Sequence, residues 1–260
     1  MRFGRPAPGC SRRSVLLWGG LGLAGWAGLV PGRLRAQPRP EPLLHWVGGD
    51  LPPFVWQADG RGQGYAHDLA LAMARRLGRP EQVQFFPWAR AVKLTAEGEP
   101  YGVFPLARTP DREQGFRWLI PLQRVDYTLF VRAAAPPELG LESLKTHKVV
   151  VLRGSPIINN LRAAGFQQLT DATSYRDMLR MLDEGMVAAA YAGRPMLRAA
   201  MREAQLAPAR YREVANLGEA VLYMACSLSI GAEEAQRWVE AHKALEADGT
   251  AARLRERYGL

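Results

Sequence analysis

The chain has 260 residues, a formal net charge of +9 and an isoelectric point of about 10.0. Six arginines and no acidic residue lie within residues 1–36, so removing that segment lowers the charge from +9 by 6, to +3. No long block of like charge remains in the rest of the chain. We therefore expect no nucleic-acid partner.

The N-terminal segment has the pattern of an export signal. Arg12 and Arg13 precede an apolar run from Val15 to Val30, and Ala36 follows shortly after. A basic head before a short apolar stretch is typical of a cleaved signal, and the paired arginines resemble the twin-arginine type. We expect residues 1–36 to be removed near Ala36 and the mature protein to reach the periplasm. A permanent membrane anchor is the alternative, but the glycines of the run and Pro31 weaken a spanning helix.

The cysteine and histidine content points to a fold held by its hydrophobic core alone. Cys10 lies in the signal, so Cys226 is the only cysteine of the mature chain and no intramolecular disulfide is possible. About 220 residues suffice for one large domain or two smaller lobes. The histidines show no metal-ligand spacing; they stand at positions 45, 67, 147 and 242. We therefore expect neither a metal nor a cofactor.

The mature chain alternates between expected strands and helices. In the first half we expect strands at 43–49, 82–86 and 101–107 and helices at 66–78 and 88–98. In the second half we expect strands at 148–152 and 186–193, a further apolar run at 218–228, and helices at 155–165, 174–185, 233–249 and 250–259. Such alternation predicts an α/β fold with parallel sheets covered by helices. Extended segments at Tyr127–Arg132 and Ala220–Ser227 separate the two series and could cross between two lobes.

A hydroxyl residue followed by proline stands after one strand of each series. These pairs are Thr109-Pro110 and Ser155-Pro156, and arginines at 108, 112 and 153 lie beside them. Ser or Thr before Pro is a helix-start signal, and free N–H groups at a helix start attract anions. Ordinary capping explains either pair alone. The two together predict an anion site between the series, where an arginine could hold a carboxylate by two hydrogen bonds.

Several motifs resemble the family-3 periplasmic solute-binding proteins, the amino-acid binders of ABC importers. They are "LPPFVW", "GYAHDLALAMARRLG", "FFPWARAVKLTAEG", "ARTPDR" and "LEADGTAARLRERYGL", in that order along residues 42–260. The resemblance implies a type II-like, two-lobed periplasmic-binding-protein fold with two crossover strands and a hinge-closing monomer. It implies one lobe from 42–127 plus 226–260 and a second from 128–225. The implied partners are a small-molecule solute and an inner-membrane ABC permease.

The resemblance also implies roles for individual residues. Arg112 matches the arginine that holds the ligand carboxylate, and Thr109 matches the hydroxyl residue three places before it. Gly154 and Ser155 match the turn of the second lobe that contacts the same carboxylate. Trp88 matches an aromatic residue that lines the pocket. Arg108 is a second, weaker candidate for the carboxylate.

The chain departs from the family pattern where the ligand ammonium would bind. Ala188 stands at the place that we align with an aspartate of the second lobe. Tyr101 stands at the comparable place in the first lobe, and Leu51 replaces an aromatic residue. An ammonium without a partner in a closed cleft is costly, so we expect the ligand to lack an α-ammonium or to place it elsewhere. The acids that could substitute are Asp50, Asp126 and Glu219.

The resulting hypothesis is a non-enzymatic periplasmic binding protein for a small carboxylate-bearing solute, serving an ABC importer. Two alternatives stay open. One is an enzyme on the same fold, similar to the cyclohexadienyl dehydratase of this family, which would need a general acid in the cleft. The other is a sensory or partner-binding module that does not transport. The sequence offers no catalytic motif.

Overall fold

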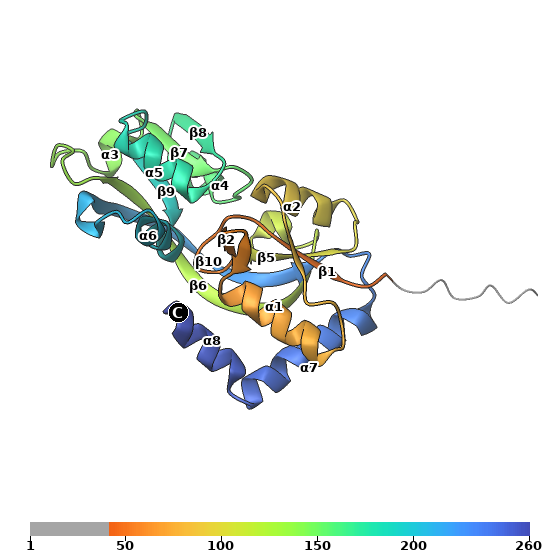
Figure 1. Cartoon of the computed structure of the whole chain (residues 1–260). Coiled ribbons are helices and arrows are strands. Elements are labelled where there is room, and N and C mark those ends of the chain that lie inside the picture. The colour runs from red at the N-terminus through yellow and green to blue at the C-terminus, as the bar shows by residue number, and fades with distance from the viewer. Residues whose placement is uncertain (1–41) are drawn as a thin grey trace, which may run out of the picture. The chain divides into compact units, whose positions relative to one another are not determined.

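The computed structural model describes residues 42–260 of the protein. The predicted export signal lies outside this range. Within it, no helix is long and apolar enough to cross a membrane. The described residues form two α/β lobes joined by two long strands (Figure 1), as the alternation of elements predicts.

The first lobe is built on three parallel strands, with β1 between the other two. They are β1 (His45–Gly48), β4 (Val83–Phe85) and β5 (Tyr101–Ala107). A hairpin of β2 (Trp56–Ala58) and β3 (Arg61–Gln63) follows β1. The helices are α1 (Tyr65–Arg76), α2 (Trp88–Ala96), α7 (Ala232–Ala247) and α8 (Thr250–Tyr258). Helix α1 contacts both α7 and α8, so residues from the end of the chain complete the lobe that residues 42–107 begin (Figure 1).

The second lobe repeats this plan with β7 between two parallel neighbours. Its strands are β7 (Lys148–Leu152), β8 (Gln168–Ala172) and β9 (Ala189–Gly193). Its helices are α3 (Leu141–Leu144), α4 (Ile158–Ala163), α5 (Tyr175–Asp183) and α6 (Arg194–Glu203). Ser174 caps α5 by accepting a hydrogen bond from the Asp177 N–H at 3.0 Å, as the spacing of these two residues predicts.

Two strands of sixteen residues each, β6 (Arg117–Arg132) and β10 (Tyr211–Cys226), run through both lobes as an antiparallel pair. Short 3-10 helices precede them, η1 (Pro110–Arg112) and η2 (Pro208–Arg210). Strand β5 pairs with one end of β10, and β9 pairs with the opposite half of β6. The strands therefore form a single hydrogen-bonded order, β4-β1-β5-β10-β6-β9-β7-β8.

This single order differs from the expected pair of separate sheets, because each crossover strand is longer than predicted and pairs in both lobes. The pairing of β10 with β6 shifts register between Asn216 and Glu219. Gly218, inside this break, has a φ of 145°, a conformation that favours glycine. The hydrogen bonding between β6 and β10 is thus interrupted between the region where β10 pairs with β5 and the region where β6 pairs with β9. The two lobes therefore stay distinct although one pair of strands runs through both. The residue limits predicted for the lobes stay a prediction.

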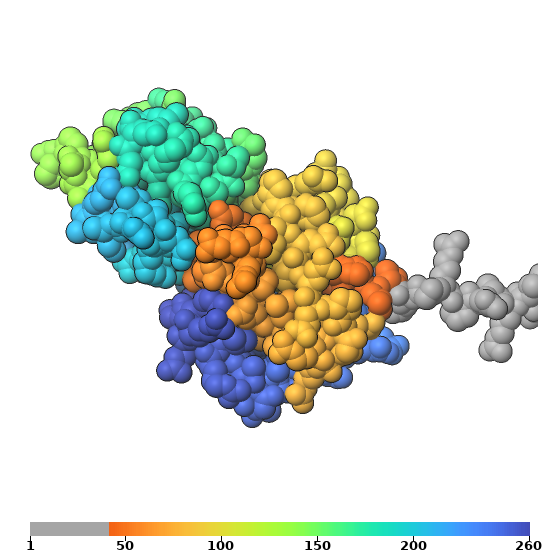
Figure 2. Space-filling model, viewed as in Figure 1, coloured from red at the N-terminus to blue at the C-terminus, as the bar shows by residue number. Residues whose placement is uncertain are grey.

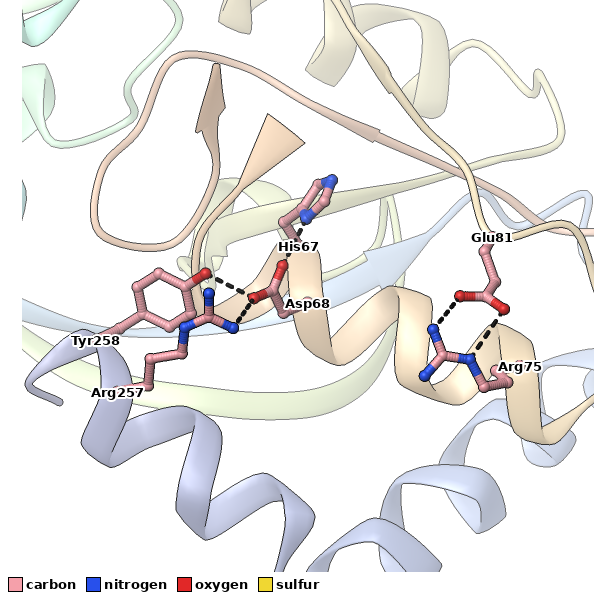
Figure 3. Close-up of polar contacts among 6 residues, drawn as sticks. All are labelled: His67, Asp68, Arg75, Glu81, Arg257 and Tyr258. Carbon is pink, nitrogen blue, oxygen red and sulfur yellow. Dashed lines mark hydrogen bonds and ion pairs between the residues drawn. The ribbon is translucent and has the colours of Figure 1, made fainter. Parts of the chain in front are cut away.

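A polar cluster fastens α8 to the start of α1 (Figure 3). The Asp68 carboxylate accepts a hydrogen bond from the Tyr258 hydroxyl at 2.6 Å and lies 2.9 Å from His67 Nδ1. Arg257 lies 3.4 Å from the same carboxylate. Burial acts to raise the pKa of Asp68, but the hydrogen bonds from His67 and Tyr258 outweigh it, so the pKa is lowered. Ionised Asp68 therefore stabilises the fold.

We expect Asp68→Asn to lower the free energy of unfolding by about 1–2 kcal/mol at neutral pH, because a charge-assisted hydrogen bond is lost. A lowered folded-state pKa gives stability that is present above the unfolded pKa and is lost as the pH falls. The difference between wild type and Asp68→Asn should therefore shrink in acid. Urea unfolding at neutral and acidic pH measures this. Glu81→Gln is the control, because Glu81 pairs with Arg75 on the exposed face of α1 (Figure 3), and it should change stability little.

Candidate ligand-binding site between the lobes

A small cavity lies between the lobes at the carboxyl ends of their strands, the usual place for a ligand in open α/β sheets. Leu152 ends β7, and Leu51 follows β1. The side chains that line the cavity include Leu51, Trp88 and Arg112 from the first lobe and Leu152, Ser155 and Tyr175 from the second. Figure 2 shows the two lobes in contact on the face that it presents. The cavity is mainly apolar, with a few polar groups directed at one space, as binding pockets are.

Arg112 is the one charged residue in this lining. Its Nη2 donates a hydrogen bond of 2.7 Å to the Gly154 carbonyl oxygen of the other lobe. Its Nη1 lies 3.4 Å from the Ala107 carbonyl oxygen. No acidic side chain of residues 42–260 lies within ion-pair distance of it. Burial lowers the pKa of Arg112 to about 10, and Asp111 acts on it only at longer range. The guanidinium therefore stays charged at neutral pH without an acid in contact and favours an anion in the cavity.

The two residues that precede η1 do not line the cavity. Arg108 pairs with Glu113 through two hydrogen bonds of 2.9 and 2.5 Å and lies over the rings of Trp118 and Tyr223. It is therefore engaged at the surface. Thr109 precedes η1, and its buried hydroxyl has no hydrogen-bond partner within the described residues. The predicted cap hydrogen bond of Thr109 is absent there.

The predicted helix start at Ser155 is wrong. Helix α4 begins at Ile158, and a turn occupies the residues before it. Ser155 instead lines the cavity with Pro156. Since η1 has only three residues, neither hydroxyl–proline pair opens a helix of useful length. The paired helix starts on which the predicted anion site depended are thus absent, and Arg112 is the one cation that lines the cavity.

Gly154 allows the lobes to approach each other. Its φ is 80°, and a Cβ at this position would lie 2.9 Å from the Cα and Cβ of Ala89 in α2. Trp88, the first residue of the same helix, is buried and lines the cavity. Helix α2 of the first lobe therefore packs directly on the Gly154 turn of the second. A side chain at 154 would hold the two apart.

The structure corrects the position at which an ammonium partner was sought. Ala188 precedes β9, whose carboxyl end is Gly193, so it lies at the end of the strand away from the cleft. Tyr101 likewise begins β5 instead of ending it. The residue that reaches the cavity end of β9 is Gly193, and a Cβ there would collide with Met196 and contact Tyr127. Met196 and Tyr127 both line the cavity. The acid is absent at this place as well, and apolar side chains fill the space.

Only one of the three candidate substitute acids faces the cleft. Asp126 pairs with Arg194 at 2.8 Å, and Glu219 pairs with Arg124. Asp50 has no ion pair of this kind among residues 42–260. It lies at the mouth of the cleft, in a groove that also contains Trp88.

Two tyrosines of the site were not singled out from the sequence. Burial raises the pKa of Tyr127, although Arg112 acts in the opposite direction. Burial also raises the pKa of Tyr175. Both hydroxyls stay protonated and can donate a hydrogen bond to an anion beside Arg112. The expected order of strands and helices put Tyr127 in a crossover strand and Tyr175 in a helix. It did not predict that both side chains face the same cavity.

Comparison with known proteins identifies the family. The sequence profile of the bacterial extracellular solute-binding proteins, family 3, matches residues 45–260. The chain belongs to this family. The family predicted from the motifs is confirmed, and with it the two-lobed α/β fold.

Three solved structures of similar fold each match 83% of this family-3 chain. A histidine kinase sensor domain with similarity to periplasmic binding proteins matches with a TM-score of 0.72 and 24% identity, over 95% of its length. A mutant of ArgBP from T. maritima matches at 0.73 and 17%, over 94%. A substrate-binding protein of an ABC uptake transporter from Streptococcus pneumoniae, with bound histidine, matches at 0.74 and 14%, over 92%. These likenesses show the fold.

One curated relative is an enzyme by name. The membrane-bound lytic murein transglycosylase F of Ectopseudomonas mendocina (strain ymp) is 25% identical over 160 residues, which is 58% of this chain. The chain spans 33% of that relative's length. The match therefore concerns a part of the relative and leaves its remaining two thirds without a counterpart.

Proposed function

We propose that this protein is a periplasmic binding protein that captures a small carboxylate without an α-ammonium group. Arg112 carries the proposal: it is a cation in an interlobe cavity with no acidic partner in the described residues. A carboxylate placed there would replace the long contact to Ala107 with charge-assisted hydrogen bonds. The hydroxyls of Tyr127, Tyr175 and Ser155 can donate to the same oxygens.

The apolar lining of the cavity supports a ligand whose carbon skeleton is apolar next to the carboxylate. Trp88, Leu152, Met196 and Leu222 line it, and the cavity end of β9 provides a glycine where an acid would be needed for an ammonium. Similar proteins include binders of arginine, glutamine and histidine. We propose that this chain keeps the carboxylate half of such a site and lacks the ammonium half.

The biological setting follows the family. We propose that the signal of residues 1–36 directs export, that the mature protein acts as a monomer and that an ABC permease receives the solute. We propose no catalytic step, because the cavity lining holds no carboxylic acid that could act as a general acid. A sensory role is the second candidate, since a histidine kinase sensor domain shares the fold.

A thermal-shift screen tests the proposed ligand class. We expect small organic carboxylates with an apolar body to stabilise the protein, and the common L-amino acids to change its melting temperature little. Ligand at about a hundred times Kd adds about 2.7 kcal/mol, which raises the melting temperature of a domain this size by roughly 2–4 °C per kcal/mol. Strong stabilisation by an ordinary amino acid, confirmed by calorimetry, would contradict the proposal.

A further inference from the structure

The cleft continues beyond the cavity that holds Arg112. A wider groove opens outside it, and Asp50 and Trp88 of the first lobe face Thr173 and Arg176 of the second across this groove. The outer groove has a volume of about 540 Å³, whereas the volume of the inner cavity is only about 20 Å³. The inner cavity therefore suits one end of a ligand, and the outer groove has room for the rest.

The two spaces share side chains and belong to one path. Trp88 lines both the inner cavity and the outer groove. Tyr175 lines the inner cavity and a small recess that Asp50 also lines. Residues adjacent in sequence line different spaces. Leu51 and Tyr175 line the inner cavity, whereas their neighbours Asp50 and Arg176 line only the outer groove and the recess.

The outer end carries a negative charge without a direct partner. Asp50 has no hydrogen bond or ion pair to the residues that the structure describes. Burial raises the pKa of Asp50, and at longer range Arg176 lowers this pKa while Glu203 raises it. Asp50 and Arg176 are the charged residues that line the outer groove, and Glu203 joins them in the small recess, whereas Arg112 is the one charge that lines the inner cavity. The groove also contains the rings of Phe85, Phe86 and Trp88, and aromatic faces attract cations. Arg90 already lies over the Phe86 ring, 5.2 Å from its centroid, so Phe85 and Trp88 are the rings that could attract a cation of the ligand.

We propose that Asp50 forms a second subsite, which takes the cationic end of a zwitterion whose carboxylate lies on Arg112. The ligand class is that of ω-amino carboxylates, in which a carbon chain separates the two charges. An α-ammonium lies one carbon from its carboxylate and would stay in the inner cavity, where Met196 and Gly193 offer it no acid. A chain that passes Trp88 brings the cation to Asp50. This inference rests on the proposed carboxylate site of Arg112.

Paired ligands that differ only in the amino group test the second subsite. Calorimetry would compare 4-aminobutanoate, 5-aminopentanoate and 6-aminohexanoate with butanoate, pentanoate and hexanoate. We expect at least one ω-amino acid to bind wild type about tenfold more tightly than its partner without the amino group, as for a charge-assisted hydrogen bond in a partly exposed site. Asp50→Asn should abolish that advantage and leave the affinity for the simple carboxylate unchanged.

Glu99→Gln is the matched control, because Glu99 is exposed and lies before the start of β5, at the end of the strand away from the cleft. It removes the same charge and should keep the advantage. If every ω-amino acid binds wild type no better than its partner, or if Asp50→Asn retains the advantage, the second subsite is wrong while the carboxylate site stands. If no carboxylate of either kind binds wild type, the proposed function fails and the second subsite with it.

Discussion

Replacing Arg112 with alanine is expected to weaken carboxylate binding by roughly 2–5 kcal/mol, the usual cost of removing one partner of a desolvated charge pair. The guanidinium is the one charge in the lining of the inner cavity, so no neighbour can take over its role. Its hydrogen bond to the Gly154 carbonyl oxygen is also lost. Folding should change little, because the variant removes a desolvated cation together with that bond. Calorimetry with a carboxylate from the screen measures the affinity, and urea unfolding measures the stability.

Arg108→Ala is the matched control for Arg112→Ala. Both variants lose one guanidinium within five residues of chain, but Arg108 pairs with Glu113 and lies outside the cavity. We expect its affinity for the carboxylate to stay close to that of wild type. Equal losses in the two variants would indicate a general effect of charge instead of a direct contact, and an unchanged affinity in Arg112→Ala would remove Arg112 from the site.

The second large effect is expected from Gly154→Ala. The added Cβ meets the Cα and Cβ of Ala89 at 2.9 Å, and the backbone of a helix cannot move aside as a flexible side chain can. The lobes should then close less completely. Because apparent affinity falls in proportion to the fraction of molecules that can close, we expect binding to weaken by about tenfold or more. Small-angle scattering with and without ligand should show that the variant fails to compact.

Gly165→Ala separates the interlobe clash from backbone strain. Gly165 has a φ of 88°, close to that of Gly154, but a Cβ there meets only the Lys145 side chain, at 3.9 Å. Alanine at a positive φ lowers the free energy of unfolding by about 1 kcal/mol at either site. Only Gly154→Ala should also lose affinity. A similar affinity loss in both variants would mean that strain in the second lobe, and not the contact with α2, limits binding.

The sequence pointed to both Arg112 and Arg108, but only one of them lines the cavity. The motif "ARTPDR" led to Arg112, and the structure places that residue in the interlobe cavity. The same motif led to Arg108, which the structure places in a surface pair with Glu113. Sequence spacing gave both arginines a similar position beside η1. What separates them is the direction of each side chain, which depends on contacts with β10 and the second lobe.

Helix α6 is absent from the helices expected above, although its residues carry the pattern of a helix. Its sequence "RPMLRAAMRE" has Pro195 at the second position, and Met196, Leu197, Ala200 and Met201 are buried on one side. Proline near a helix start and apolar residues at this spacing predict a helix. The sequence also contained the information that excludes Ala188 from the site. Ligands bind at the carboxyl ends of parallel strands, and Ala188 stands before its strand.

The sequence by itself determined the α/β class, the two series of strands and helices, the crossover segments and the family, because these depend on local periodicity and on motif order. Only the tertiary structure decided which residues meet in the cleft. Tyr127, Tyr175 and Met196 come from a crossover strand, α5 and α6, and Asp50 lines the same groove as Arg176 of the opposite lobe. Those approaches depend on how the two lobes close on one ribbon of β6 and β10. These contacts join residues that are far apart in the chain, so no local sequence pattern predicts them.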